Sequence, residues 1–105
     1  ARGMASRFAI RARMIHDMLH RNDLRVHQPG AGMFTVIDIS ATGLSGEDFA
    51  RKLLDEEHVA VRPGESFGQG LAGWLRISLT RPDDEIAEAC RRIAAFTARQ
   101  MGKAA

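Results

Sequence analysis

The sequence predicts a small α/β domain of the two-layer α+β type, with a mostly antiparallel sheet of three to four strands and helices on one face. Segments with a helical hydrophobic period, the first of them long, alternate with short runs of β-branched residues. Hydrophobic residues make up 45% and charged residues 27% of the chain, a balance that excludes disorder. No long linker divides the 105 residues, so we expect residues 1–105 to form a single domain.

Composition and charge exclude several classes of protein. No apolar stretch approaches the roughly 18–20 residues that cross a bilayer, and no signal peptide opens the chain. The single cysteine excludes an internal disulfide and a cysteine-rich zinc site. The formal net charge of +2 is too small for a dedicated nucleic-acid-binding protein. We expect a soluble, cytoplasmic protein with no membrane partner and no nucleic-acid partner.

The first predicted element is a long helix over residues 3–21. One stripe of a 3.6-residue period contains Met4, Phe8, Ile15, Met18 and Leu19. Only two residues precede this helix, and they include neither an initiator methionine nor a convincing helix cap. We therefore expect the chain to be a piece cut from a longer protein.

Two strands and a helix come next. Residues 24–27 alternate apolar and polar side chains, which predicts a short edge strand, and residues 33–39 form the clearest strand of the chain. Ser45 offers a cap, with an acidic residue three positions later, for a helix predicted over residues 46–57. The predicted buried side of this helix consists of Phe49, Ala50, Leu53 and Leu54.

The second half of the chain begins with a short strand predicted over residues 59–61. Pro63 and Gly64 suit the centre of a type II turn, which leads into a glycine-rich loop that ends at residue 73. Residues 74–79 alternate strictly, and this pattern predicts a strand with two different faces. Leu75, Ile77 and Leu79 share one face, and Trp74, Arg76 and Ser78 share the other.

The last predicted element is a helix that ends at about residue 100. Thr80 and Asp83 suit a capping box, and Pro82 suits the first turn, where its missing N–H removes no hydrogen bond. Cys90 falls on the inner side of this helix, which indicates a packed thiol rather than a nucleophile. The complete inner stripe is Ile86, Ala89, Cys90, Ile93 and Thr97.

Arg76 is the first candidate for a binding site. It lies in the middle of a predicted strand, after a glycine-rich loop that leaves space around it. A guanidinium presents a planar fork of donors that matches a carboxylate with two hydrogen bonds, which lysine cannot do. The pattern alone favours the simpler interpretation of an ordinary arginine on a solvated strand face.

Other patterns that suggest chemistry fail on their surroundings. His16 and His20 lie four residues apart on the first helix, but no third ligand stands at a recognisable spacing, so a solvated helix face is the better interpretation. The glycine-rich stretch at residues 64–70 precedes a strand and lacks the ending of a phosphate-binding loop. Ser66 has no predicted Asp-His relay, so a hydrolase is not indicated.

Four motifs follow one another along the chain. They are Gln-Pro-Gly-Ala-Gly-Met-Phe at residues 28–34, Gly-Leu-Ser-Gly-Glu-Asp-Phe-Ala at residues 43–50, Val-Ala-Val-Arg-Pro-Gly-Glu-Ser-Phe-Gly at residues 59–68, and Gly-Trp-Leu-Arg-Ile-Ser-Leu at residues 73–79. Each motif alone is weak, but the four in this order and spacing are specific. Together they resemble the C-terminal small domain of class I/II pyridoxal-phosphate aminotransferases, which have fold type I. The resemblance covers nearly the whole chain.

The resemblance implies roles for three residues. Arg76 corresponds to the arginine that binds the α-carboxylate of the substrate in this family. Phe34 resembles the aromatic residue that lines the substrate pocket, and Gly32 would let the backbone pass close to the substrate. Thr35 stands where many members of the family have tyrosine. The resemblance implies no catalytic, cofactor-binding or metal-binding residue within this chain.

The resemblance also implies what lies outside the chain. The family's chemistry needs a lysine that binds pyridoxal phosphate covalently, and Lys52 and Lys103, the only two lysines, lack the motif around it. The cofactor-binding large domain is expected upstream, so this chain alone should bind no cofactor and be inactive. The full-length enzyme would be a homodimeric transaminase that transfers an amino group from an amino acid to a 2-oxo acid.

A second class of function stays open at this point. The chain could be a free-standing α/β regulatory module whose Arg76 face binds an acidic ligand or a protein partner. A nucleic-acid-binding module built on the basic first helix is a weaker alternative. An upstream large domain with a cofactor lysine would favour the enzyme.

Overall fold

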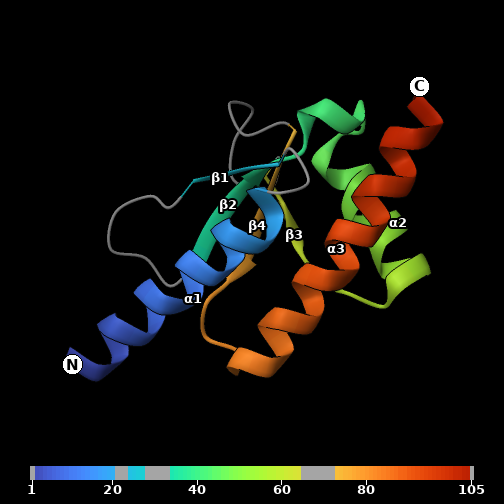
Figure 1. Cartoon of the computed structure of the whole chain (residues 1–105). Coiled ribbons are helices and arrows are strands. Elements are labelled where there is room, and N and C mark those ends of the chain that lie inside the picture. Colours follow the sequence, from blue (N-terminus) through green and yellow to red (C-terminus); the bar gives the residue numbers. More distant parts are fainter. Residues whose placement is uncertain (1, 21–23, 28–33, 65–72, 105) are drawn as a thin grey trace.

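A computed structural model describes residues 2–20, 24–27, 34–64 and 73–104. These residues form the predicted two-layer α+β domain, in which a long leading helix precedes an antiparallel sheet (Figure 1). In chain order the elements are α1 (Arg2–His20), β1 (Arg25–His27), β2 (Phe34–Asp38), the 3-10 helix η1 (Ser40–Thr42), α2 (Gly46–Glu57), β3 (Arg62–Pro63), β4 (Trp74–Ser78) and α3 (Asp83–Ala104). Among the helices of these ranges, none has the length and apolarity that crossing a membrane requires.

β4 is an interior strand of the sheet, with β2 on one side and β3 on the other. The strand order is β1-β2-β4-β3, and all three pairings are antiparallel. Arg76 of β4 lies opposite Val36 of β2 on one side and opposite Arg62 of β3 on the other. Residues that face each other across an antiparallel pair project to the same side of the sheet, so these three residues share a face.

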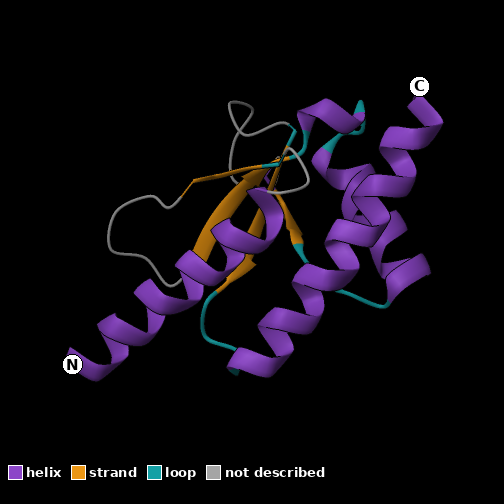
Figure 2. Ribbon diagram, in the orientation of Figure 1, coloured by secondary structure: helices purple, strands orange, loops and turns teal. Residues whose placement is uncertain are grey.

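The core lies between the sheet and the helices. α1 and α3 run side by side, and the N- and C-termini lie at opposite ends of the molecule (Figure 2). Ile15 and Leu19 of α1 are fully buried, as predicted from the hydrophobic stripe. Along β4, Leu75 and Ile77 are buried whereas Arg76 is half-buried, which confirms the predicted difference between the two faces. The helices therefore cover the apolar face of the sheet.

The start of α2 confirms the predicted cap. The Ser45 hydroxyl accepts a hydrogen bond of 3.1 Å from the Asp48 N–H, which satisfies one of the amides that a helix start leaves without a partner. Leu54, however, which the apolar pattern predicts to be buried, is 51% exposed. Phe49 and Leu53 of the same helix are fully buried, so the apolar stripe of α2 is narrower than its sequence suggests.

The start of α3 differs from the predicted capping box. The Thr80 hydroxyl lies 2.6 Å from the Ser78 Oγ rather than against the helix, and Thr80 also donates its N–H to that oxygen at 3.1 Å. The Pro82 carbonyl accepts from the Ile86 N–H at 3.1 Å, so Pro82 precedes the helix instead of lying in its first turn. α3 continues to Ala104, a few residues beyond the predicted end.

The strand predicted at residues 59–61 is the wrong segment. β3 consists of Arg62 and Pro63, which pair with Arg76 and Leu75 of β4. Proline cannot donate to a ladder, but an edge strand tolerates it because its outer side has no partner strand. The β-branched residues before Arg62, Val59 and Val61, pack against the core without forming a strand, and the pairing begins at the residues expected to form a turn.

Arg11 connects α1 to the corner between β4 and α3. Its Nε donates to the Asp83 Oδ1 at 2.6 Å, and its Nη1 donates to the Leu79 carbonyl at 2.8 Å. The Arg11 side chain is only 14% exposed, so these hydrogen bonds are shielded from solvent on one side. Leu79 is fully buried, and its carbonyl therefore depends on Arg11.

We expect the Arg11→Ala variant to lose about 2 kcal/mol of unfolding free energy, because a buried carbonyl is left without its donor. The measurement is urea unfolding followed by far-UV circular dichroism. Arg13→Ala is the matched control on the same helix, since the Arg13 side chain is 81% exposed and pairs with Asp17 at 3.7 Å. The control should change stability by less than about 0.5 kcal/mol. Equal losses in the two variants would contradict the role given to Arg11.

Candidate functional site

The candidate site is centred on Arg76, in the middle of β4. The side chain is half-buried on the sheet face that the helices leave uncovered. The flanking strands hold the backbone on both sides, because Val36 lies opposite Arg76 in β2 and Arg62 lies opposite it in β3. The guanidinium therefore starts from a rigid strand rather than from a loop.

The Arg76 guanidinium contacts the aromatic ring of Phe34. The Arg76 Cζ is 4.6 Å from the centre of the Phe34 ring, within the range of a cation–π contact. Phe34 faces Ser78 across the β2–β4 pair, so it is the diagonal neighbour of Arg76 on the same face. The structure thus brings together two of the three residues predicted to bind substrate. The third, Gly32, lies outside the described residues.

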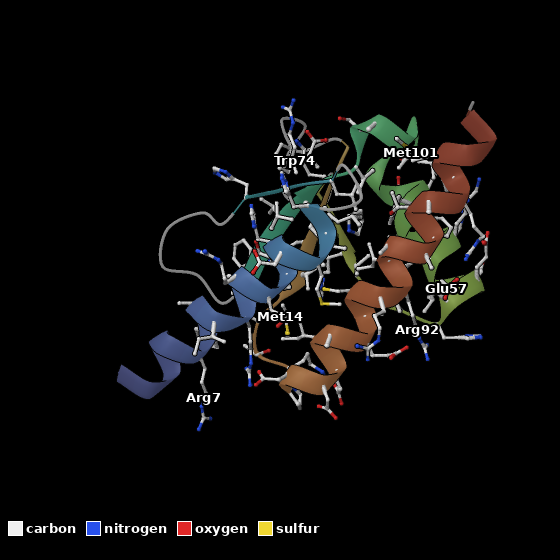
Figure 3. The ribbon with its side chains drawn as sticks, viewed as in Figure 1. Arg7, Met14, Glu57, Trp74, Arg92 and Met101 are labelled. Carbon is white, nitrogen blue, oxygen red and sulfur yellow. The ribbon has the colours of Figure 1, made fainter. Side chains whose placement is uncertain are left out.

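One end of this face is closed by Trp74 and Asp38, which lie opposite each other in β4 and β2. Both are half-buried, and Trp74 lies at the end of the sheet away from the start of α3 (Figure 3). The Asp38 Oδ1 accepts a hydrogen bond of 2.9 Å from the Ser40 N–H, where η1 begins. Asp38 thereby fixes the turn that follows β2, and it is the acidic residue of that strand.

An open groove of about 810 Å³ runs from Arg76 toward α3. Its walls are residues 58–63, residues 76–78 and the side of α3 that includes Ile86 and Ala89. β3 is only two residues long, so beyond Arg76 the chain before β3 and strand β4 diverge and leave this space between them. Its lining combines apolar residues, such as Ile77 and Ile86, with charged side chains.

The charges around the groove are unequal. Among the described residues, its lining includes four arginines (Arg62, Arg76, Arg81 and Arg92) against two glutamates (Glu85 and Glu88). Arg81 pairs with Glu85 at 2.8 Å, and Arg92 pairs with Glu88 at 3.0 Å. Hydrogen bonds from Arg91 and Arg92 lower the pKa of the Glu88 carboxyl. Both glutamates are thus held by arginines at the α3 end of the groove.

Arg92 also closes the far wall of the groove. Its Nη1 donates to the Glu57 carbonyl at 2.7 Å, which ties α3 to the end of α2 (Figure 3). Arg99 reinforces this junction through the Glu57 carboxylate at 2.7 Å. The groove therefore has α2 and α3, which these hydrogen bonds connect, on one side and β4 with Arg76 on the other.

His16 and His20 lie on an exposed face of α1, as predicted. Their rings stack almost parallel, with centres 5.2 Å apart and an interplanar angle of 9°. The His16 Nδ1 lies 3.3 Å from the Asp17 Oδ1. Across the ranges that the structure describes, no group of three or more histidine, cysteine, aspartate or glutamate side chains is arranged to hold a metal ion.

Cys90 is fully buried on the inner side of α3, which confirms the packed thiol. Burial raises the pKa of the thiol to about 11, although the charge of Arg91 opposes this shift. We expect Cys90 to react with a disulfide reagent only after urea unfolds the chain, because the native thiol is neither ionised nor accessible. Reaction of the native chain at the rate of the unfolded chain would contradict this expectation.

The same shift predicts a pH dependence of stability. The pKa of Cys90 is higher in the folded chain than its ordinary value of 9.0, so the proton is bound more tightly in the folded state. The contribution of the Cys90 thiol to the free energy of unfolding is therefore complete below about pH 9 and is lost as the pH rises toward about 11. Urea unfolding across this range measures the effect, and Cys90→Ala should flatten the pH dependence.

Arg62 lies in this site although its sequence context predicts no such role. The pattern predicts a strand that ends at residue 61, which places Arg62 in a turn rather than beside Arg76. A signal was present in the chain, because Arg62 directly precedes Pro63 in one of the four motifs, and proline favours an extended residue before it. The pairing partner of that extended residue becomes visible only in the folded sheet.

Comparison with known sequences identifies the family. The sequence model of the family described as "Aminotransferase class I and II" matches residues 1–93. The chain is 46% identical over 81 residues to the arginine–pyruvate transaminase AruH of Pseudomonas aeruginosa, covering 77% of this chain and 21% of that protein. It is 36% identical over 70 residues to an aspartate aminotransferase of Pyrococcus horikoshii, covering 67% and 18% respectively. The chain thus spans about a fifth of the length of these relatives.

Solved structures show the same fold. An aromatic aminotransferase from Pyrococcus horikoshii matches with a TM-score of 0.87 and 26% identity, covering 93% of this chain and 26% of that one. An aminotransferase from Mycobacterium tuberculosis matches with a TM-score of 0.81 and 28% identity, covering 90% and 25% respectively. Because the family model matches most of the chain and both structures share its fold, the chain belongs to the class I and II aminotransferases, the fold-type I family that uses pyridoxal phosphate.

Proposed function

We propose that this chain is the substrate-carboxylate domain of a pyridoxal-phosphate-dependent transaminase. The enzyme transfers an amino group from an amino acid to a 2-oxo acid, and Arg76 binds the α-carboxylate of both. The observation that carries the proposal is the position of Arg76, a half-buried guanidinium on a central strand that lies 4.6 Å over the Phe34 ring. Such a side chain presents its donors to one side and holds them there.

Arg76 contributes binding and orientation. Two parallel N–H donors grip both oxygens of a carboxylate, which removes rotation about the axis of the bound group. Holding a reacting group in one orientation lowers the barrier because the entropy of alignment is lost on binding rather than in the reaction step. Phe34 packs against the guanidinium and offers an apolar surface to the substrate. Loss of either residue should therefore weaken substrate capture.

The described residues alone do not make a cofactor site. Among them, no lysine lines the groove beside Arg76, and Lys52 is half-buried on α2, outside that groove. Pyridoxal phosphate supplies an electron sink when bound, and it needs a lysine and a phosphate site. We place those groups in a large domain that belongs to the same enzyme, and we expect the complete enzyme to be a cytoplasmic homodimer.

Activity of the complete polypeptide that carries this chain tests the proposal. We expect amino-group transfer from at least one amino acid to a 2-oxo acid, and chromatography of both products measures it. The 105-residue chain, supplied with equimolar pyridoxal phosphate and reduced with borohydride, should show no cofactor attached to lysine by mass spectrometry. A complete polypeptide without transaminase activity on any of the common amino acids would refute the proposal. Binding of acidic ligands without turnover would instead favour a regulatory module.

A further inference from the structure

Arg11 joins three elements at one point, the corner where β4 ends and α3 begins. Its side chain extends from α1, donates to the Leu79 carbonyl just after β4, and donates to Asp83 in the first turn of α3. The Arg11 side chain is 14% exposed, whereas the other arginines with described ion pairs are 41–81% exposed. Arg11 is thus enclosed in the fold, and both of its hydrogen bonds hold the corner that follows the strand of Arg76.

The end of β4 has a partner strand on one side only. β3 pairs with β4 no further than Arg76, so the last two residues of β4 pair with β2 alone. After β4 the chain turns, and Thr80 contacts the Ser78 Oγ through its N–H at 3.1 Å and through its hydroxyl at 2.6 Å. These contacts close the corner around Leu79, and the hydrogen bond from Arg11 attaches the corner to α1.

The same end of β4 holds Phe34 beside Arg76. Ser78 lies opposite Phe34 in the β2–β4 pair, and the Arg76 Cζ lies 4.6 Å from the centre of the Phe34 ring. The ends of secondary-structure elements open more readily than their centres, because fewer contacts hold them. An opening at this end of β4 separates Ser78 from Phe34 and removes the pairing that keeps the ring and the guanidinium together.

We propose that Arg11 is a positioning residue for the carboxylate site: it holds the end of β4 closed, so that the Arg76 guanidinium stays aligned beside Phe34. The inference rests on the proposed function, because Arg76 is taken to bind the α-carboxylate of the substrate. An arginine suits this task, since its planar fork directs N–H donors at two separate acceptors, here the Leu79 carbonyl and the Asp83 carboxylate. Arg11 acts through the strand rather than on the substrate.

NMR of the ¹⁵N-labelled 105-residue chain tests the position of Arg76 directly. The ring current of Phe34 shifts the Arg76 Nε–H proton signal, and the Phe34→Leu variant gives the signal position without the ring. Arg11→Met removes the donors of Arg11 and keeps an apolar stem that packs in the same place. We expect the Arg76 signal of this variant to move about halfway toward the Phe34→Leu value, because the strand end is open for part of the time. A signal that stays at the wild-type value overturns the inference.

Two control variants separate this effect from charge and from stability. Arg13→Met removes the same charge from the same helix, at a side chain that is 81% exposed. Ile93→Val truncates a fully buried side chain and lowers stability, at a position about 15 Å along α3 from Asp83. Both controls should keep the Arg76 signal at its wild-type position. A shift in either control as large as that of Arg11→Met would assign the effect to charge or to stability and overturn the inference.

In the complete enzyme, Arg11→Met should lower kcat/KM for amino acids about tenfold, because a displaced guanidinium aligns the carboxylate poorly. Amines without a carboxylate should keep the wild-type kcat/KM. Since Arg11 acts through Arg76, the double variant with Arg11→Met and Arg76→Lys should lose no more activity than Arg76→Lys alone. Equal losses on both substrate classes, or losses that multiply in the double variant, would assign Arg11 a purely structural role and overturn the inference.

The proposed function and this inference fail in different ways. If Arg76→Lys affects substrates with and without a carboxylate equally, the proposed role of Arg76 fails, and the NMR signal still decides whether Arg11 positions that side chain. If Arg76→Lys distinguishes the two substrate classes and Arg11→Met matches the wild type in both experiments, the inference about Arg11 is wrong and the proposed function stands.

Discussion

The Arg76→Lys variant of the complete enzyme should lose about one to two orders of magnitude in kcat/KM for amino acids. Lysine keeps the positive charge, but it cannot form the two parallel hydrogen bonds that a guanidinium makes to a carboxylate. A hydrogen bond between charged partners contributes roughly 1.5–3 kcal/mol, which corresponds to this range of rates. Steady-state kinetics with saturating 2-oxo acid measures the loss. Cofactor binding should stay nearly the same, because Arg76 is proposed to contact the substrate carboxylate.

Amines without a carboxylate provide the control for Arg76. An arginine that acts only on the carboxylate contributes nothing to their turnover, so Arg76→Lys should leave their kcat/KM unchanged. The folded chain should also keep its Tm, because a half-buried arginine at the strand face adds little stability. Equal loss of activity on substrates with and without a carboxylate would show that Arg76 does not act as the carboxylate ligand.

The Phe49→Ala variant should lose about 3–5 kcal/mol of unfolding free energy, a large part of the stability of a domain of this size. The Phe49 and Phe96 rings are both fully buried, with centres 4.9 Å apart and planes at 84°, an edge-to-face contact between α2 and α3. Truncation removes this contact and leaves a cavity between the two helices. Urea or thermal unfolding followed by circular dichroism measures the loss.

Leu54→Ala is the matched control for Phe49→Ala on the same helix. The Leu54 side chain is 51% exposed, so its truncation should cost less than about 1 kcal/mol. A loss of comparable size in the two variants would mean that Leu54 is covered in solution. That result would mean that the buried stripe of α2 includes Leu54, as the sequence pattern predicts.

The elements predicted well are those whose information is local. The alternation of residues 74–79 corresponds to β4, and the Ser45 cap and the apolar spacing correspond to α2. Each pattern is set by backbone periodicity and by hydrogen bonds within a few residues of the chain. The same holds for α1, whose predicted bounds differ from the observed ones by one residue at each end.

The wrong predictions concern features that depend on contacts with residues far away in the sequence. The helical pattern places the apolar Leu54 beside the buried residues of α2. Whether its side chain is buried depends on where the neighbouring elements lie. Residues 59–61 have a higher β-propensity than Arg62 and Pro63, yet the register with β4 selects the latter pair. The missed role of Phe96, which packs on Phe49 from a helix nearly fifty residues away, has the same origin.

The same difference between local information and distant contacts applies to the candidate site. Arg76 was identifiable from its place in a strand and from a family resemblance, whereas its contact with Phe34 depends on the register of β2 against β4. The sequence does not indicate a site role for Arg62, since an arginine beside a proline is common on surfaces. The opposition of two arginines becomes apparent only when β3 is paired.

The interior position of β4 has a consequence for the timescale on which the site moves. Edge strands exchange their amide hydrogens through small local openings, whereas a strand flanked on both sides exchanges only when larger units of the protein open. β4 is flanked by β2 and β3 at Arg76, and β1 covers the outer edge of β2. The backbone beneath Arg76 is therefore already ordered before any substrate arrives, and binding need not immobilise it. Adaptation to different substrates is left to the outer strand β3 and to the side chains around the groove.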